Sequence, residues 1–267
     1  MGQPITVVDS FTDVPFAGNP AGVCILAAPT TEAWMQAVAA ELNLAETAFA
    51  SPRTDGAVDL RWFTPETEVG LCGHATLATA HVLGGAGRFH TAAGVLTCSR
   101  GEAGTIVMDF PAVRVAPVDD PPDWTPALGL PAGRITGVWA NDEGWVLAEA
   151  ATAADVRAIA ADSAAILALG GHIVVVAAPG DRPGVDSVCR VFGPGVGIDE
   201  DPVTGAAHCI IGPWLAARTG RREFVGEQAS RRGGTVGMRV DGDRVGLTGR
   251  AVTVWEGALA VDAPPAG

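Results

Sequence analysis

The stretch RWFTPETEVGLCGHATLATAHVL, residues 61–83, passes from a strand pattern through a glycine-containing loop into a helix pattern. A second stretch of the same kind, DEDPVTGAAHCIIGPWLAARTG, occupies residues 199–220. In each half of the chain the order reads strand, strand, helix, strand, strand, helix, strand, strand, with the loop just before the second helix. We therefore predict an internal duplication: two similar halves of α+β structure, each with one loop-to-helix junction.

The element boundaries follow from hydrophobic periodicity and from cap and turn signals. In the first half we expect strands at residues 5–11, 21–26, 46–51, 58–63, 95–100 and 105–111, and helices at 32–42 and 74–83. In the second half we expect strands at residues 135–140, 144–150, 172–179 and 185–192, one helix from a Thr152 cap to about Leu167, and another at 206–220 that Pro213 kinks or interrupts. Asp241-Gly242 indicates a turn between two late strands.

The proline-rich segment DDPPDWTPALGLPAG, residues 119–133, is typical of an interdomain linker. We accordingly expect an N-terminal domain at residues 1–118 and a C-terminal domain at residues 119–267. A chain of 267 residues accommodates two domains of ordinary size. Apolar residues make up 48% of the chain and charged residues 18%, so both domains can bury a core.

Composition excludes several classes of function. The formal net charge is -13, so the chain lacks the clustered cations that nucleic acid binding needs, and an anionic membrane surface would repel it. The apolar runs are far shorter than the roughly 20 residues of a membrane-spanning helix. All 17 basic residues are arginine. Without lysine the chain can form neither a Schiff base with pyridoxal phosphate nor a lysine-containing phosphate loop.

The cysteines and the N-terminus indicate a cytoplasmic protein. Five cysteines are an odd number without paired close spacing, which predicts free thiols in a reducing compartment. The first residues show no basic region followed by an apolar core, so we expect no secretory signal.

The two junctions are the first candidates for a functional site. The start of a helix presents unpaired N–H groups and the positive end of the helix dipole, so two such starts facing one cleft would hold an anion. The residues alone leave a second interpretation open, in which Asp201 only caps its helix and His74 only packs.

Four segments in order along the chain resemble the phenazine-biosynthesis PhzF-like family. They are DSFTDVPFAGNPAGV at residues 9–23, NLAETAF at 43–49, RWFTPETEVGLCGHATLATAHVL at 61–83 and DEDPVTGAAH at 199–208. The resemblance implies the diaminopimelate epimerase-like fold, in which two similar domains each curl a β-sheet around a central helix and a cleft lies between them. It also implies a homodimer, a small and carboxylate-bearing substrate, and an isomerase that moves a carbon-bound proton with no metal or organic cofactor.

The resemblance carries roles to individual residues. Glu46 matches the glutamate that removes and returns the proton, and His74 and Asp201 match the other polar catalytic residues. Apolar neighbours of Glu46 fit this role, because burial favours the protonated form of a carboxyl group. The chain departs from phenazine-pathway members at Ala206, where they carry serine, so the phenazine substrate itself is not implied. The residues expected to bind substrate are Asn19, Cys72, Gly73, Thr204, Gly205 and Ala206.

Two other functions stay open from the sequence. LCGH, residues 71–74, also resembles the first thiol motif of proline racemases, which would make Cys72 the base of an amino-acid racemase or epimerase. Such a mechanism needs a second thiol at the other junction, where the chain has Val203 and Thr204. A small-molecule-binding or interaction protein without catalysis is the third possibility. The remaining histidines, for which a structural role is expected, are His81, His90, His172 and His208.

Overall fold

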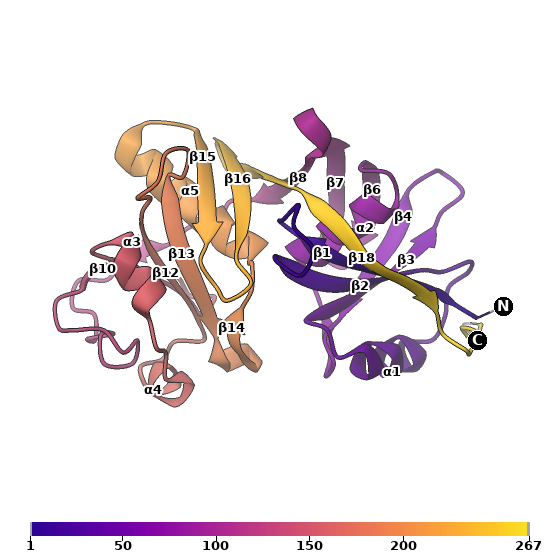
Figure 1. The fold of residues 1–267 in the computed structure, drawn as a ribbon, viewed down its shortest axis with the longest axis horizontal. Coiled ribbons are helices and arrows are strands. Elements are labelled where there is room, and N and C mark those ends of the chain that lie inside the picture. The colour runs from indigo at the N-terminus through magenta and orange to yellow at the C-terminus, as the bar shows by residue number, and fades with distance from the viewer. Residues whose placement is uncertain (1, 266–267) are drawn as a thin grey trace. The chain divides into compact units, whose positions relative to one another are not determined.

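The structure is a computed structural model that describes residues 2–265, and it divides into two compact units (Figure 1). The first unit comprises Met1–Phe110 together with Thr248–Gly267, and the second comprises Pro111–Leu247. Both combine antiparallel and parallel strand pairs with few helices, which confirms the predicted α+β class. No helix among the described residues is long and apolar enough to cross a membrane.

The first unit begins with strand pairs that enclose a helix. Its elements are β1 (Pro4–Ser10), β2 (Asn19–Ile25), α1 (Glu32–Leu42), β3 (Glu46–Pro52), β4 (Val58–Phe63), β5 (Glu68–Val69), α2 (Gly73–Val82), β6 (Gly87–Thr91), β7 (Gly94–Arg100), β8 (Ile106–Pro111) and the C-terminal strand β18 (Ala251–Ala258). The helix at residues 32–42 and the strand at 58–63 match their predicted bounds.

The second unit repeats this order. Its elements are β9 (Ala116–Pro117), β10 (Ile135–Ala140), β11 (Trp145–Ala150), α3 (Ala153–Ala158), α4 (Ser163–Ala168), β12 (Ile173–Pro179), β13 (Ser187–Gly193), β14 (Ile198–Asp201), α5 (Gly205–Thr219), β15 (Glu223–Gln228), β16 (Gly234–Asp241) and β17 (Arg244–Gly249). Gly242 has a φ of 63° in the predicted turn after β16, a backbone conformation that glycine adopts without strain.

Strand pairing shows that the two units share one topology. β2 runs parallel to β3 as β11 runs parallel to β12, and β4 runs parallel to β6 as β13 runs parallel to β15. The antiparallel pairs also correspond, since β3 pairs with β4 and β12 with β13. This agreement confirms the predicted internal duplication.

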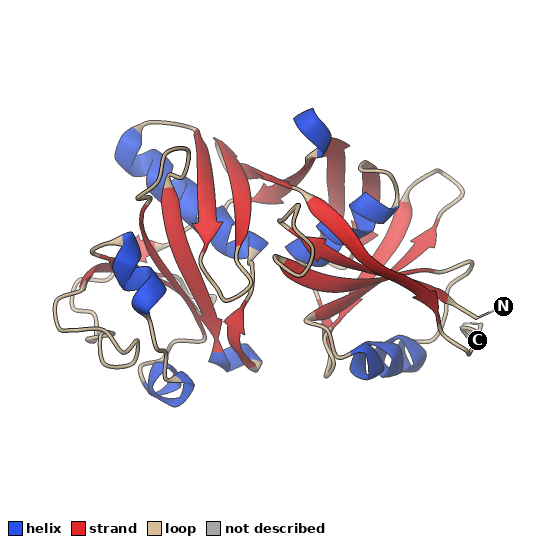
Figure 2. Cartoon of the chain, in the orientation of Figure 1, coloured by secondary structure: helices blue, strands red, loops and turns tan. Residues whose placement is uncertain are grey.

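A buried helix lies at the centre of each unit, with strands around it (Figure 2). Every residue of α2 from His74 to Ala80 is buried, and the helix packs against β1, β2, β3 and β18. In α5, most residues from Gly205 to Leu215 are buried and the helix packs against β15 and β16. Because the first turn of each helix is fixed inside its unit, the loop before it is also held in place.

The predicted domain boundaries are wrong at both ends of the second domain. β18 pairs antiparallel with β1, so the C-terminal strand belongs to the first unit and not to a domain 119–267. Residues 119–133 are not a linker, because Trp124 and Leu128 are buried in the core of the second unit with Val156 and Ile166. The proline content of that segment reflects its irregular backbone and not exposure.

The predicted helices of the second unit also needed correction. The one predicted after Thr152 is two short helices, because Ile159 takes a ψ of 130° and Asp162 caps α4. Pro213 does not interrupt α5, which continues to Thr219. Pro213 has no N–H to donate to the Cys209 carbonyl. That carbonyl accepts a 3.0 Å hydrogen bond from the Val113 N–H instead.

Candidate functional site

Glu46 and His74 come from neighbouring elements of the first unit. Glu46 is the first residue of β3, opposite Ala21 of β2 in a parallel pair. His74 is the second residue of α2, and Cys72 is the residue that precedes the helix. The packing of α2 against β2 and β3 therefore places Glu46, in the middle of the NLAETAF segment, beside the CGH segment.

Three polar groups surround the His74 imidazole. Its Nε2 lies 3.0 Å from Oε2 of Glu46, while Nδ1 lies 3.5 Å from Sγ of Cys72 and 3.2 Å from Nδ2 of Asn19. The His74 side chain is 6% exposed and that of Glu46 is 13% exposed. A carboxylate, an imidazole and a thiol are thus in direct contact, with the carboxylate the least buried of the three.

The backbone around His74 is fixed by side chains from two elements. Ser10 Oγ, at the end of β1, donates a 2.8 Å hydrogen bond to the His74 carbonyl. Thr76 Oγ1 donates to the Cys72 carbonyl within the first turn of α2. Sequence reasoning missed Ser10, because its partner is 64 residues away and no local pattern reports that contact.

The Nε2 contact is short, but it is not aligned as a hydrogen bond. Among the described residues, Nε2 of His74 has no hydrogen-bond partner although it is buried. With the ring protonated the 3.0 Å contact is an ion pair, and a ligand oxygen in line with the N–H would complete the hydrogen bonding of Nε2. The carboxylate and a bound molecule can therefore share this side of the imidazole.

The cluster changes the acid–base behaviour of its members. Burial alone would lower the pKa of His74, but the adjacent Cys72 and Glu46 outweigh it and hold that pKa well above its ordinary value. Burial raises the pKa of the Cys72 thiol, and the Glu46 charge adds to that effect. The cluster therefore favours a protonated His74 ring and disfavours ionisation of the Cys72 thiol.

The second unit holds the other predicted residues at the start of α5. Asp201 Oδ2 accepts a 2.5 Å hydrogen bond from Thr204 Oγ1, and Gln228 Oε1 accepts from the Thr204 N–H at 2.8 Å. Gln228 Nε2 also donates to the Asp201 carbonyl at 2.7 Å. Thr204, not Asp201, occupies the cap position, and it makes no side-chain cap bond. Sequence reasoning missed Gln228, which reaches this loop from a separate strand.

The predicted site residues form two groups, one in each unit. Asn19, Glu46, Cys72, Gly73 and His74 lie together in the first unit. In the second unit, the group at the start of α5 comprises Asp201, Thr204, Gly205 and Ala206.

His208, in the first turn of α5, has a structural environment. Burial lowers its pKa to about 4, so the ring is neutral, and Nδ1 lies 2.9 Å from the Thr204 carbonyl. Its Nε2 lies 3.9 Å from Sγ of Cys189. His81 contacts Thr253 at 3.1 Å through Nε2. All five cysteines are buried and free, as predicted.

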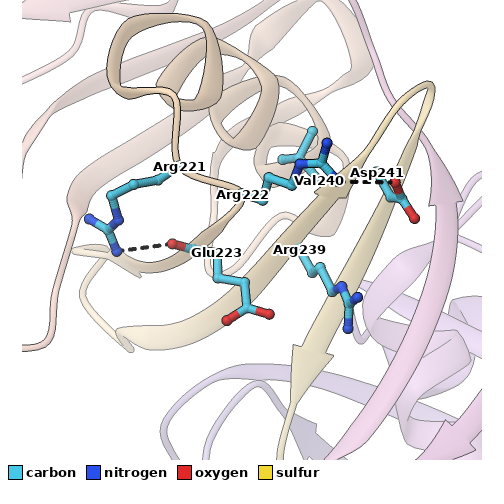
Figure 3. Close-up of a pocket in the computed structure, with 6 residues that line it drawn as sticks. All are labelled: Arg221, Arg222, Glu223, Arg239, Val240 and Asp241. Atoms are coloured by element: carbon cyan, nitrogen blue, oxygen red, sulfur yellow. Dashed lines mark hydrogen bonds and ion pairs between the residues drawn. The ribbon is translucent and has the colours of Figure 1, made fainter.

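A surface pocket of about 390 Å³ lies elsewhere in the second unit (Figure 3). It is lined by Arg221, Arg222, Glu223, Arg239, Val240 and Asp241. Two of its arginines are engaged by carboxylates, because Arg221 pairs with Asp186 and Arg222 with Asp241. Apart from Val240, the lining of this pocket consists of arginines and carboxylates.

Comparisons with known proteins identify relatives over the whole chain. The family described as phenazine biosynthesis-like protein matches residues 8–257. An uncharacterized isomerase of Halalkalibacterium halodurans is 39% identical, over 97% of this chain and 99% of its own. An uncharacterized isomerase of Pseudomonas aeruginosa is 43% identical over the same shares. A PhzF-family structure from Enterococcus faecalis is 35% identical with a TM-score of 0.91, over 98% of this chain and all of that one.

Proposed function

This chain belongs to the phenazine biosynthesis-like family, and from that premise we propose that it is an isomerase that moves a carbon-bound proton with Glu46 as general acid and base. Relatives named isomerases support an isomerase-type enzyme, and to this we add a mechanism and a substrate class. The observation that carries the mechanism is the 3.0 Å contact between Glu46 Oε2 and His74 Nε2 inside the first unit.

Glu46 takes the proton. Its carboxylate accepts the proton from a substrate carbon, the electron pair stays on the substrate, and the carboxyl group returns the proton to a second carbon. A single group does both steps, so the proton stays at the site between them. The position suits this role, because the side chain is largely buried yet still 13% exposed.

We assign His74 two roles, one toward the Glu46 carboxylate and one toward the substrate. As an imidazolium it stabilises the carboxylate before proton transfer. Its buried Nε2 is also available to a substrate oxygen on which negative charge develops. Asn19 contacts the other ring nitrogen, so we assign it the role of holding the ring in place as well as lining the site.

The start of α5 supplies the second group of ligands. The first N–H groups of a helix favour an anion, which makes Gly205 and Ala206 suitable for a substrate carboxylate. Asp201, held by Thr204, is the second polar side chain proposed to contact the substrate. We propose that both groups take part in the reaction.

The experiment that tests this function follows carbon-bound hydrogen directly. The protein is incubated in D₂O with a panel of cyclic amino and hydroxy acids, and deuterium incorporation is read by NMR. We expect at least one compound to exchange, and Glu46→Gln to abolish that exchange. A protein that binds panel members but exchanges none of them, in either form, would be a binding protein without catalysis.

The contact between Cys72 Sγ and His74 Nδ1 favours one second candidate, a thiol-dependent racemase or epimerase. Two observations count against it. Burial raises the pKa of the Cys72 thiol, whereas a basic thiolate needs the opposite shift. The corresponding residue before α5 is Thr204, so a second thiol is missing at that junction.

A further inference from the structure

The side chains of Glu46, Cys72 and His74 form a cluster of three different metal-ligating groups. One oxygen, one sulfur and one nitrogen atom, one from each residue, all lie within 4.8 Å of one another. Carboxylate, thiolate and imidazole are the donors that zinc takes in proteins, and three protein ligands with an open fourth position are typical of its reactive sites. Softer donors of this kind favour Zn²⁺ or Cd²⁺ over Mg²⁺ or Ca²⁺.

A second and independent observation concerns His74. Its Nε2 is buried and has no hydrogen bond within the described part of the chain, although Glu46 Oε2 is only 3.0 Å away. The opposite nitrogen, Nδ1, lies 3.2 Å from the amide group of Asn19 and 3.5 Å from Sγ of Cys72, so Sγ must move toward the Nε2 side when the ion binds there. Histidine ligands commonly bind the metal with one nitrogen and hydrogen-bond a carbonyl with the other, which the Asn19 amide oxygen supplies if the amide is turned over.

From these contacts we propose that Glu46, Cys72 and His74 bind one soft divalent cation, such as Zn²⁺, as an inhibitor of the enzyme. The binding itself stands on the cluster alone, while the inhibition rests on the proposed function. An ion held by the Glu46 carboxylate and by His74 Nε2 occupies the groups assigned to proton transfer and to the substrate oxygen.

The charges of the ligands offset the free-energy cost of burying a divalent cation. On binding, the Cys72 thiol and the protonated His74 ring each release a proton to solvent, so a thiolate and a carboxylate face a doubly charged cation beside a neutral imidazole. The four groups then carry no net charge, which avoids the large cost of burying an uncompensated ion. Metal–ligand distances of about 2.0–2.3 Å require the three side chains to close by on the order of 1 Å.

The experiment titrates metal-free protein with Cd²⁺ and records the ultraviolet charge-transfer band of a cadmium–thiolate bond. We expect the band to saturate at one Cd²⁺ per chain and to disappear when Zn²⁺ is added in excess. Cys72→Ser should lose the band, and Asn19→Ala should weaken binding by about 10–100-fold, the effect of removing a group that orients a ligand.

The matched control is Cys189→Ser. Cys189 is also a buried thiol beside a histidine, His208, but its cluster lacks a carboxylate within ligating distance among the described residues. The band should persist in this variant with unchanged affinity, and thermal melts should show that both serine variants fold. A wild-type protein without the band, or a band that survives Cys72→Ser, would overturn the site.

The exchange assay separates this inference from the proposed function. Protein treated with a chelator should exchange deuterium, lose exchange when Zn²⁺ is added, and regain it with fresh chelator. Exchange that persists with the cadmium–thiolate band fully formed would overturn inhibition. Metal-free protein that exchanges no compound would contradict the proposed function, while the cadmium band would still decide the metal site.

Discussion

His74 and His208 lie in the first turns of corresponding helices, α2 and α5, and both are buried, yet their protonation differs. The pKa of His74 is held well above the ordinary value by its neighbours Cys72 and Glu46, against the effect of burial. The pKa of His208 is lowered to about 4 by burial, which its contact with the Thr204 carbonyl only partly offsets. The contrast teaches that one scaffold holds a charged imidazole in one unit and a neutral one in the other.

The scaffold itself is shared in detail. In β4, Arg61 pairs with Glu68 at 2.6 Å and lies over the Phe63 ring at 5.2 Å. In β13, Arg190 pairs with Glu200 at 2.7 Å and lies over the Phe192 ring at 5.2 Å. The two arginines hold the strand pairs that lead into the two junctions.

The reactive groups are not shared. Ile173 is the first residue of β12, where Glu46 begins β3, and Ala206 is the second residue of α5, where His74 is the second of α2. The second unit therefore lacks both the carboxylate and the imidazole of the first. We infer that the duplicated halves have divided the work, with proton transfer assigned to the first unit and anion binding to the second.

Replacing Glu46 should have the largest effect on deuterium exchange. Glu46→Gln keeps the shape of the side chain but removes the base, so deuterium exchange should fall by about 10²–10⁴-fold. Glu149→Gln in the second unit is the control, because Glu149 is 14% exposed, against 13% for Glu46, and is paired with Arg218. Equal losses in the two variants would contradict the assignment of catalysis to the first unit.

The neutral His208 of the second unit should make the free energy of unfolding fall at low pH. The folded-state pKa of His208 is about 4 against an ordinary 6.5, so between these values the unfolded chain binds a proton that the folded chain does not. The contribution of His208 to the free energy of unfolding is therefore fully present above pH 6.5 and is lost as pH falls toward 4. A shift of this size corresponds to about 3 kcal/mol.

Urea unfolding at a series of pH values measures this loss. His208→Gln should flatten the acid side of the profile, whereas the exposed His172→Gln should leave it as in the wild type. The His74 contribution has the opposite sign, since it is complete below pH 6.5 and is lost as pH rises through the raised folded-state pKa. Identical acid profiles for His208→Gln and the wild type would contradict the buried neutral state.

Local patterns were enough to predict much of this comparison. The helix at 32–42 and the strand at 58–63 have strong periodicity and clear end signals, and the first junction motif pointed to His74, whereas Glu46 came from the family resemblance. What failed depends on partners far along the chain. Neither the pairing of β18 with β1 nor the hydrogen bond from Val113 to the Cys209 carbonyl can be predicted from the sequence close to these residues.

Ala206 offers a smaller test of the second unit. Members of the phenazine pathway are expected to carry serine at this position, where a hydroxyl would bond the substrate. Ala206→Ser should lower KM for ring-bearing carboxylates by about tenfold, with kcat nearly unchanged. A factor of about ten corresponds to the largest net contribution expected from one hydrogen bond. Steady-state kinetics on an exchanging substrate checks this, and Ala207→Ser on the buried side of α5 is the contrast. An unchanged KM in Ala206→Ser would remove Ala206 from the substrate site.

Replacing Cys72 should have the smallest effect and yet separates the two candidate mechanisms. If Glu46 is the base, Cys72 only lines the site, and Cys72→Ser should change the exchange rate by less than about tenfold, the residual coming from a shifted His74. If the thiol is a base, the same change removes a reacting group and exchange should fall by at least about 100-fold. Measuring Cys72→Ser and Glu46→Gln on one substrate decides the matter, because each mechanism predicts that a different one of the two variants stays active.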